Sequence, residues 1–455
     1  MTFSKTKTID GELIGQVKAL IRDVEVGTLK DLIAEMRPAD VADLIEHLEA
    51  DERLFIIRLL EPEGAGDILV EVEAPIQGRI LEEMDNQSIS EIVQELDSDD
   101  AADLVGDLPD ERARDIIDRV EEDVSQDLKK LLPYPEDTAG GIMALEFVAV
   151  EADATLKDAI ETIRAKGDEV ENLYYVWVVD DAERLVGVIS LKDLIVEPPE
   201  RRVRDIMNRE VISVDVHTDQ EEVARLVKKY DLVNIPVVDE NQRLVGRITH
   251  DDIIDVIEEE VDEDISLMAG VIDQEITEVS PTKISRARLP WLIAGLCGEL
   301  FAAVVISRFE ASLQKIIALS FFFPVIMAMG GSTGTQAATV IVRGFATGDI
   351  SLLNAGKRLW TEMRVALMNG MICGVILGLV VGTCLSDYLL GGVVAIAMIL
   401  IIINAGFIGS AAPFVLKKLN IDPALATGPF VTTSNDIIGL FIYLGFVTLF
   451  LRFTS

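Results

Sequence analysis

The chain divides into a C-terminal third of long apolar stretches and an N-terminal part in which apolar and polar residues alternate at short intervals. Five apolar segments are long enough to cross a bilayer, which takes about 20 residues. They cover residues 289–307, 316–345, 365–385, 389–416 and 424–451. Isolated apolar runs can be buried core helices, but five in succession predict a membrane domain, which we place at residues 288–455.

Residues 1–132 have a pattern typical of an all-helical array. Segments such as PADVADLIEHL (38–48) and DDAADLVGDL (99–108) repeat a small-Asp-apolar sequence at helical spacing. Short helices of this kind bury an apolar face only by stacking on their neighbours. The sequence therefore predicts a superhelical, all-α N-domain.

An internal repeat follows. VVDDAERLVGVISLKDLI (178–195) and VVDENQRLVGRITHDDII (237–254) superpose with an offset of 59 residues. Each predicts a strand, a polar turn, a second strand and a helix that a Ser or Thr caps. The motifs GVISLKD and GRITHDD resemble those of tandem CBS domains, which implies two α+β domains at 133–200 and 201–260. A connecting plug helix is expected at 261–287, beginning in the acidic run 258–264 and interrupted near Pro281.

Charge is distributed very unevenly between the two parts. Residues 283–455 carry 12 Lys and Arg against 7 Asp and Glu, so the net charge of −39 leaves −44 on residues 1–282. Such a surplus repels nucleic acid and attracts cations, although it also serves simple solubility. The three cysteines lie in apolar stretches and only three histidines are present, so neither a disulfide framework nor a zinc site is expected.

The basic residues that flank the apolar segments predict the orientation. Nine Lys and Arg lie on the side that carries the N-terminal part, and three lie on the other side. Because Lys and Arg favour the cytoplasmic side, we expect a multi-pass protein of the cell (inner) membrane with its N-terminal half in the cytoplasm and its C-terminus outside. The N-terminus has no pattern of a cleavable signal peptide.

Asp436 stands out within the last apolar segment. It lies 12 residues beyond Ala424, or about 18 Å along a helix. A lone carboxylate at such a depth costs roughly 2.5–3.5 kcal/mol, so it usually faces a water-filled path or a partner. The alternative is a neutral Asp that hydrogen-bonds a neighbouring helix. Glu299, midway along the first segment, is a second candidate.

Two further segments indicate an ion path. GGSTGTQAAT (330–339) and NAGFIGSAAP (404–413) contain residues that weaken helices and line cavities, although glycines at these positions can also allow close helix packing. Carboxylate, hydroxyl, amide and carbonyl oxygens are hard donors, and they suit a largely hydrated Mg²⁺. They do not exclude Mn²⁺, Co²⁺ or Ca²⁺.

Taken together, the chain resembles the MgtE family of magnesium transporters over essentially its whole length. The motifs that carry the resemblance are YPEDTAGGIM (134–143), DQEEVARL (219–226), the segment 324–336 ending in GGSTGTQ, and IDPALATGPFVTTSNDIIG (421–439). The resemblance implies a homodimer in the lipid bilayer with a Mg²⁺ pore on its two-fold axis, closed by cytoplasmic Mg²⁺. Because the membrane potential acts on both charges of the ion and no P-loop is present, we expect passive, voltage-driven uptake.

The resemblance also assigns roles to particular residues. Asp436 would bind Mg²⁺ in the pore, Asp422 would lie near its cytoplasmic mouth, and Gly331, Gly334, Asn404 and Thr432 would line it. Regulatory Mg²⁺ would be held by Asp99, Asp103, Gly141, Glu221, Asp231, Asp252, Asp255, Glu260, Glu263 and Asp264. ATP is a possible ligand of the CBS domains at Tyr175, Lys192 and Asp193. Ser332 and Thr335 replace an Asn of some relatives, which leaves their contacts open.

Two other functions remain open at the level of the sequence. The chain could transport divalent cations more broadly, including Mn²⁺ and Co²⁺, or be a nucleotide-sensing CBS membrane receptor without transport. An enzyme is not expected, since the sequence contains no recognisable nucleophile–base pair or metal–water site.

Overall fold

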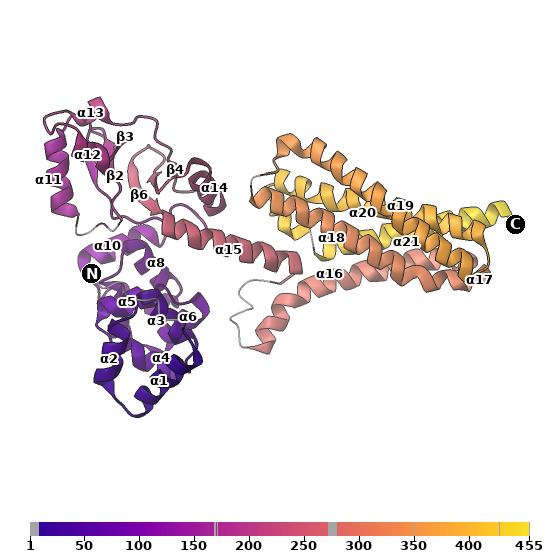
Figure 1. Cartoon of the computed structure of the whole chain (residues 1–455), viewed down its shortest axis with the longest axis horizontal. Helices are drawn as coiled ribbons and strands as arrows, with labels where there is room; N and C mark the ends of the chain where they lie inside the picture. Colours follow the sequence, from indigo (N-terminus) through magenta and orange to yellow (C-terminus); the bar gives the residue numbers. More distant parts are fainter. Residues whose placement is uncertain are drawn as a thin grey trace. The chain divides into compact units, whose positions relative to one another are not determined.

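The computed structural model describes residues 9–454 apart from 168, 169, 171, 272–279, 348 and 427. The chain forms two compact units, Met1–Glu258 and Glu259–Ser455. Figure 1 labels most of the helices and strands of both units in chain order.

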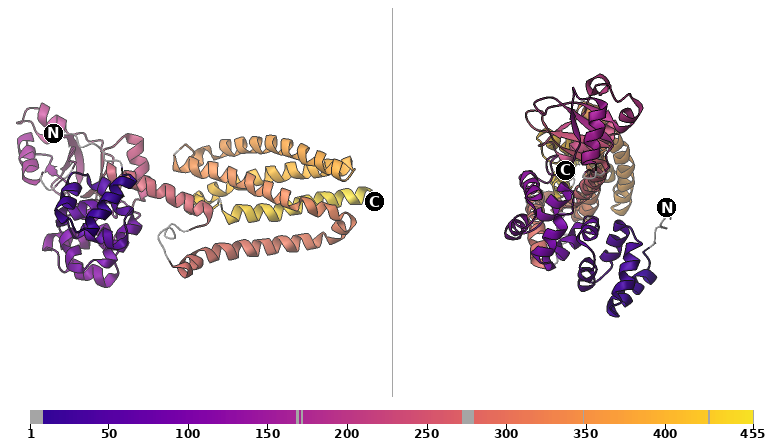
Figure 2. Two further views of the ribbon diagram at one scale, coloured as in Figure 1. Left: turned by 60° about the horizontal axis from the view of Figure 1, so that its bottom comes forward. Right: turned by 90° about the vertical axis from the view of Figure 1, so that its left-hand side faces the viewer.

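An array of short helices makes up the first part of the N-terminal unit. Its members are α1 (Gly11–Arg22), α2 (Val26–Ala34), α3 (Pro38–Glu46), α4 (Ala50–Ile57), α5 (Pro62–Leu69), α6 (Ala74–Glu83), α7 (Asn86–Val93), α8 (Ser98–Gly106), α9 (Asp110–Ile117) and α10 (Glu122–Leu131). Helices two apart in the chain pack together, α3 on α5, α5 on α7 and α7 on α9, and Figure 2 shows them as one stacked group. This stacking confirms the predicted all-helical N-domain.

Local signals begin several of these helices. Pro38 and Pro62 occupy the first turns of α3 and α5, where a missing backbone N–H leaves no helical hydrogen bond unmade. The side chain of Asp85 caps α7 by accepting a hydrogen bond from the backbone N of Ser88 at 3.0 Å. α8 carries Asp99 and Asp100 in its first turn, where the helix dipole stabilises acidic side chains. Two carboxylates are thereby placed at the N-terminal end of α8.

Two three-stranded sheets follow the helical array, and both have the same topology. The first contains β1 (Ala149–Glu151), β2 (Tyr175–Val179) and β3 (Leu185–Ser190), and the second contains β4 (Val214–Asp215), β5 (Asn234–Val238) and β6 (Leu244–Thr249). Val178 pairs with Gly187 in the first sheet, as Val237 pairs with Gly246 in the second. The helices of this part are α11 (Leu156–Lys166), α12 (Leu191–Val196), α13 (Val203–Ile206), α14 (Gln220–Tyr230) and α15 (His250–Ala269). The predicted tandem CBS fold is confirmed.

The hydrophobic core of the helical array continues into the second CBS domain. One cluster of buried side chains extends from Val17 in α1 to Val256 in α15, whereas the first CBS domain has a core of its own around Val176. Ser98 at the start of α8 binds the segment that follows the array, because its hydroxyl donates to Glu146 Oε2 at 2.8 Å and accepts from the backbone N of Leu145 at 2.8 Å. The array and the second CBS domain therefore share one core.

The helix that closes the second CBS domain is longer than the sequence predicted. α15 is one helix of 20 residues, so the acidic run 258–264 lies within it instead of beginning a separate helix. No Gly or Pro interrupts this stretch, and Glu favours helix. Pro281, where we predicted an interruption, is the first residue of α16. Residues 272–279 of the predicted connecting segment lie outside the described residues.

The C-terminal unit is built around five helices that are long and apolar enough to cross a membrane, counted over the described residues. They are α16 (Pro281–Arg308), α18 (Phe323–Ala346), α19 (Ala355–Cys384), α20 (Tyr388–Lys418) and α21 (Pro429–Thr454). The connections contain α17 (Glu310–Lys315) and the 3₁₀ helices η2 (Ile317–Phe322), η3 (Leu352–Asn354) and η4 (Pro423–Ala426). Figure 2 shows the five long helices side by side, as the hydropathy pattern predicted.

The small-residue segments of this unit are helical, and the expectation that they weaken the helices is wrong. Residues 330–339 lie within α18 and residues 404–413 lie within α20, both without a break. Their glycines allow close packing instead. A Cβ added at Gly334 would overlap Nδ2 of Asn435 and lie 2.6 Å from Cγ1 of Val431, so α18 and α21 approach closely only without it.

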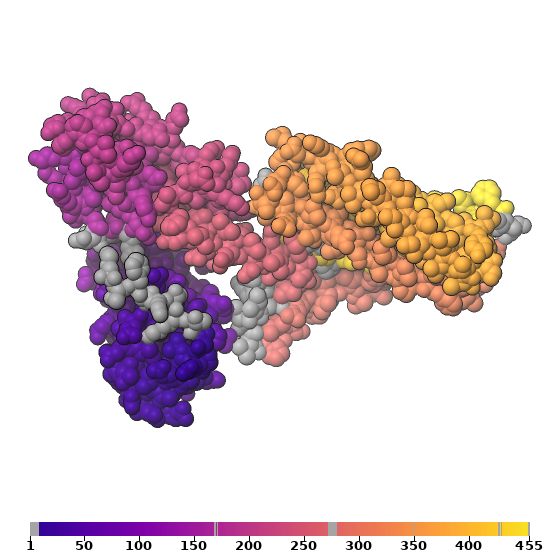
Figure 3. All heavy atoms as spheres, viewed as in Figure 1, coloured from indigo at the N-terminus to yellow at the C-terminus, as the bar shows by residue number. Residues whose placement is uncertain are grey.

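Apolar side chains cover the outer surface of the C-terminal unit. Ile372 and Ile376 of α19 are 61% and 59% exposed, and the orange atoms of α19 form a continuous outer face in Figure 3. An apolar face of this extent is unfavourable in water but is stable against lipid chains, because the helices satisfy their own backbone hydrogen bonds. The chain is therefore a membrane protein.

Candidate functional site

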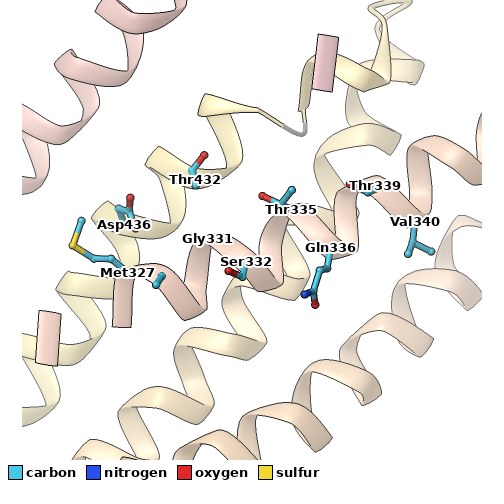
Figure 4. A pocket seen from close by; sticks show the side chains of 10 residues that line it. Met327, Gly331, Ser332, Thr335, Gln336, Thr339, Val340, Thr432 and Asp436 are labelled. Atoms are coloured by element: carbon cyan, nitrogen blue, oxygen red, sulfur yellow. The ribbon is translucent and has the colours of Figure 1, made fainter. Parts of the chain in front are cut away.

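A groove between α18 and α21 collects polar side chains in the otherwise apolar C-terminal unit. Its volume is about 770 Å³, and hydroxyl, amide and carboxylate groups project from its walls (Figure 4). The lining residues are Met327, Ala328, Gly331, Ser332, Thr335, Gln336, Thr339, Val340, Thr432 and Asp436. Oxygen donors of this kind suit a hard, hydrated cation.

Asp436 supplies the carboxylate among these lining residues. It lies seven residues beyond Pro429, or about 10 Å along α21. The sequence predicted about 18 Å from Ala424, but η4 and α21 are separate helices and do not add to one continuous rise. The side chain is 9% exposed, and its Oδ1 has no hydrogen-bond partner among the described residues. A buried carboxylate oxygen of this kind is unfavourable until a cation or a proton satisfies it.

Neighbouring hydrogen bonds hold α21 in place beside the groove. Nδ2 of Asn435 donates to the backbone O of Gly330 in α18 at 3.4 Å. The hydroxyl of Thr432 donates to the backbone O of Gly428 at 3.0 Å. The Thr432 bond is local to the start of α21, whereas the Asn435 bond and the close contact at Gly334 fix α21 on α18. The position of Asp436 therefore depends on both helices.

The residues predicted to line the pore occupy different places in a single chain. Gly331 and Thr432 line the groove, and so do Ser332 and Thr335, whose contacts the sequence had left open. Gly334 is buried between α18 and α21. Asn404 is half-buried in α20 and is not among the lining residues.

Asp422 precedes η4, in the connection between α20 and α21. Its side chain is exposed, and Oδ1 accepts a hydrogen bond from the backbone N of Ala424 at 2.7 Å. This bond holds the carboxylate at the beginning of η4, where backbone N–H groups point outward.

A second feature is an acidic cluster within the N-terminal unit, formed where α8 meets the start of α15. Asp99 and Asp100 of α8 lie close enough to Asp252 of α15 for each to feel its charge. Glu146 adds a further carboxylate beside Asp99, and Asp255 adds one beside Asp100. The structure therefore brings together carboxylates that are more than 100 residues apart in the chain.

Burial and mutual repulsion raise the pKa values of this cluster. Burial, followed by the charges of Asp252, Asp100 and Glu146, raises the pKa of Asp99 well above its usual value. Burial and neighbouring carboxylates raise the pKa of Asp100 to about 7 and that of Asp255 to about 6. Burial also raises the pKa of Asp252, against hydrogen bonds from Thr249. The cluster is thus a place where positive charge is favourable.

One buried cation accompanies the cluster. Arg247 of β6 is 2% exposed and its charge acts on Asp252, while Nε and one terminal nitrogen have no hydrogen-bond partner among the described residues. A single guanidinium does not balance the surrounding carboxylates. Over the described residues, no three His, Cys, Asp or Glu side chains form a ready metal site. The cluster therefore offers charge rather than a closed set of ligands, which suits Mg²⁺ that keeps several waters.

The other residues predicted to hold regulatory Mg²⁺ are spread over several elements. Asp103 lies one turn beyond Asp99 in α8, and Glu221 lies in the first turn of α14. Asp231 ends α14 with a left-handed φ of 52°, and Gly141 is buried with its backbone N bonded to Thr138 O at 2.9 Å. Glu260, Glu263 and Asp264 lie in the second half of α15.

The residues that the resemblance connected with ATP lie at the first CBS repeat. Tyr175 begins β2, with its ring 6.1 Å from that of Trp177. Lys192 and Asp193 are exposed in the first turn of α12, and Asp193 Oδ2 accepts a hydrogen bond from Ser190 Oγ at 2.7 Å. The three residues thus lie at the beginning of β2 and in the first turn of α12.

Two residues of the acidic cluster, Asp100 and Glu146, were not assigned a role from the sequence. Asp100 follows Asp99 directly, but the resemblance pointed only to Asp99 and Asp103 in α8. Glu146 comes from the linker after the helical array, and no local pattern points to it. Glu299 of α16 was a second candidate in the sequence, and the packing of α16 on α21 reveals that it lies within hydrogen-bonding reach of Asp436.

Comparison with known proteins agrees with this architecture. The profile of a divalent cation transporter family, MgtE, matches residues 323–446, that of the MgtE intracellular N domain matches 36–137, and that of the CBS domain matches 139–200 and 203–259. The chain is 38% identical to a magnesium transporter MgtE of Bacillus subtilis, over 73% of this chain and 74% of the relative. It is 40% identical to that of Thermus thermophilus, over 72% and 73%.

The chain belongs to the MgtE family of magnesium transporters. The resemblance that the sequence motifs suggested is thereby confirmed. Transport is a non-enzymatic function, so the expectation that the chain is not an enzyme is confirmed as well. Mg²⁺ is the substrate of the named relatives.

Solved structures resemble the N-terminal unit. The soluble part of a magnesium transporter is 32% identical and covers 55% of this chain and 98% of its own length, with a TM-score of 0.50. The cytosolic domain of the Mg²⁺ channel MgtE in complex with ATP is 35% identical and covers 53% and 99%, with a TM-score of 0.51. The helical array and CBS pair thus form the cytosolic domain of an MgtE-family membrane protein.

Proposed function

We propose that this chain forms a homodimeric, channel-like Mg²⁺ transporter in the cell membrane, driven by the membrane potential and closed by cytoplasmic Mg²⁺. The observation that carries the proposal is the polar groove between α18 and α21, with the buried, unpartnered Oδ1 of Asp436 in its wall. Asp436 attracts the ion, and the hydroxyl and amide groups of the groove contact its waters.

A second copy of the chain completes the pore in this proposal. In one chain only two helices, α18 and α21, line the groove. An ion in it would contact the membrane on its open side. Two copies related by a two-fold axis enclose the groove and bring two Asp436 carboxylates to one path. Gly334 and Asn404 then support or line the path from behind, and Asp422 faces its cytoplasmic end. The C-terminus lies outside the cell.

The membrane potential supplies the driving force for entry. Moving two charges across the membrane is worth about 4.6 kcal/mol per 100 mV. Uptake therefore needs neither a coupled ion nor nucleotide hydrolysis.

Closure rests on the acidic cluster of the cytosolic domain. Without a counterion, carboxylates about 4 Å apart repel one another by on the order of 4 kcal/mol at an effective dielectric constant near 20. Mg²⁺ between Asp99 or Asp103 of α8 and Asp252 or Asp255 of α15 removes this repulsion and favours a compact form. Glu221, Asp231, Gly141, Glu260, Glu263 and Asp264 contribute further weak sites. Because α15 leads towards the first membrane helix, the compact form closes the pore.

Nucleotide binding at the first CBS repeat is a separate proposal. A related cytosolic domain has been solved in complex with ATP, and Tyr175, Lys192 and Asp193 offer a ring, a cation and a carboxylate here. ATP would bind as a regulator and not as an energy source.

Flux into liposomes tests the proposed transport. The full-length protein is reconstituted in vesicles with a potassium diffusion potential, and Mg²⁺ entry is followed with an internal dye. Uptake that rises with the inside-negative potential, without a proton or sodium gradient, is expected. Uptake that requires such a gradient at fixed voltage contradicts the mechanism. Competition by Mn²⁺, Co²⁺ and Ca²⁺ determines whether the pore selects Mg²⁺ or accepts divalent cations broadly, and absence of any flux favours a nucleotide-sensing receptor.

A further inference from the structure

Glu299 lies near the middle of α16, at a place where a carboxylate is unfavourable without a partner. It is exposed on the surface of the chain, and its neighbours Leu296, Leu300 and Phe301 are 59%, 58% and 57% exposed. These apolar side chains face lipid or another protein surface. A carboxylate among them costs roughly 2.5–3.5 kcal/mol on insertion scales.

The packing of α16 on α21 brings Glu299 to Asp436. Gly298 lies directly against Thr433, since a Cβ at Gly298 would overlap the methyl group of Thr433. One residue further along α16, the carboxyl group of Glu299 is within hydrogen-bonding reach of Asp436. The absence of a side chain at Gly298 is what permits this approach.

The middle stretches of both helices, around the two carboxylates, contain no basic residue. Between Arg288 and Arg308 in α16, and between Pro429 and Arg452 in α21, the sequence contains no Lys or Arg. Oδ1 of Asp436 is buried, has no partner among the described residues and belongs to a side chain that lines the groove. Two carboxyl groups within hydrogen-bonding reach of each other are stable when a proton or a cation lies between them.

We infer that Glu299 and Asp436 form a two-carboxylate cation site at one wall of the ion path, and that Glu299 strengthens the preference for divalent over monovalent cations. The inference deepens the proposed function and rests on it. Each carboxylate attracts Mg²⁺ twice as strongly as K⁺ at the same distance, so a second carboxylate doubles the energy difference that favours Mg²⁺. Glu299 thus adds to selectivity from a helix that does not line the groove.

The test compares Glu299→Gln with a matched control in full-length protein reconstituted in liposomes. Gln keeps the size of the side chain and can still donate a hydrogen bond to Asp436, but it lacks the charge. We expect Glu299→Gln to lower the apparent Mg²⁺ affinity of flux about tenfold and to lower the permeability ratio of Mg²⁺ to K⁺. Glu310→Gln makes the same change in α17, away from the pair, and should leave both unchanged.

A double variant tests whether the two carboxylates act on one ion. If they do, Glu299→Gln combined with Asp436→Asn is no more impaired than Asp436→Asn alone, because the shared site is already lost. Additive losses contradict a shared ion.

Two results separate the failure of this inference from the failure of the proposed function. If Glu299→Gln has the flux, Mg²⁺ affinity and selectivity of the wild type, the inference is wrong but the proposed function stands. Glu299 is then a neutral hydrogen-bond donor. Absence of Mg²⁺ flux in the wild type overturns both. If Glu299→Gln does not elute as folded protein, Glu299→Asp replaces it, because Asp keeps the negative charge. A folded Glu299→Asp protein that loses Mg²⁺ selectivity as fully as Asp436→Asn contradicts the inference.

Discussion

Single carboxylates carry the chemistry of this protein, and their surroundings differ. Asp436 is 9% exposed within an apolar helix bundle, where its surroundings screen its charge only weakly. The acidic residues of α8 and α15 lie in the cytosolic domain, where several carboxylates together make nearby positive charge favourable. In the function we propose, the same side-chain type attracts a passing ion in one place and senses the ion concentration in the other.

Removal of the charge at Asp436 should impair Mg²⁺ conduction. Asp436→Asn keeps the shape of the side chain, so we expect reduced Mg²⁺ flux and a lower preference for Mg²⁺ over K⁺ in liposomes. If Asp436 were a packed, neutral residue, Asn would conduct normally, and unchanged flux and selectivity would contradict the pore assignment. Asp349→Asn, in the connection between α18 and α19, makes the same substitution as a control.

At the scale of elements, the close approach of α18 and α21 shapes the groove. Small residues at the contact let the two backbones come together, and Asn435 fastens α21 to Gly330 at 3.4 Å. The segments that looked weak as helices in the sequence are therefore segments at which helices pack closely. Their glycines contribute to tertiary packing rather than to an unwound backbone.

Gly334→Ala should separate these two helices. The added methyl group would overlap Asn435 and press on Val431, and overpacking of this kind costs about 1–3 kcal/mol. We expect a lower unfolding temperature in detergent and reduced flux. Gly445→Ala in α21 is the matched control, because a Cβ there meets no atom within 4 Å, and it should retain wild-type behaviour. Equal unfolding temperatures of the two variants would contradict the packing role of Gly334.

At the scale of the whole molecule, charge is separated between the two parts of the chain. About −44 lies on residues 1–282, and the acidic cluster concentrates part of it where the helical array meets the second CBS domain. The array shares its core with that domain, so loss of the contact at the cluster exposes apolar surface. Binding of positive charge at the cluster is therefore coupled to the compactness of the N-terminal unit.

The stability of this contact should depend on pH in a direction that the pKa values determine. Burial raises the pKa of Asp100 to about 7 and that of Asp255 to about 6, from an unfolded value of about 3.9. The folded form binds protons more tightly, so its stability is greatest below about pH 4 to 5 and falls as the pH rises through 6 and 7. Without Mg²⁺, the hydrogen-exchange protection factor of α8, which corrects for the faster intrinsic exchange at higher pH, should be larger at pH 5.5 than at pH 8.

Mg²⁺ should reverse this loss at pH 8, where the carboxylates are charged and free to bind it. Full-length protein with Asp252→Asn, Asp255→Asn and Glu260→Gln should lose both the pH effect and the protection by Mg²⁺, and its pore should stay open at high internal Mg²⁺. Asp181→Asn, in the exposed turn between β2 and β3, serves as the control. Equal exchange of α8 with and without Mg²⁺ at pH 8 would rule out this gate.

The sequence by itself determined the parts of this protein and their order. Hydropathy marks the five membrane helices, the helical spacing of apolar residues marks the array, and the paired motifs at Gly187 and Gly246 mark the two CBS domains. Asp436 was also found from the sequence, because a carboxylate in an apolar helix is conspicuous. These features are local, since each depends on residues within one or two elements.

Only the tertiary structure decided which distant groups meet. Glu299 reaches Asp436 because Gly298 lets α16 pack against α21, and Glu146 reaches Asp99 because Ser98 binds the linker to α8. The continuity of α18 and α20 through their glycines was likewise decided by packing against neighbouring helices. Contacts between residues far apart in the chain depend on how whole helices pack, and no periodicity along a single chain records that.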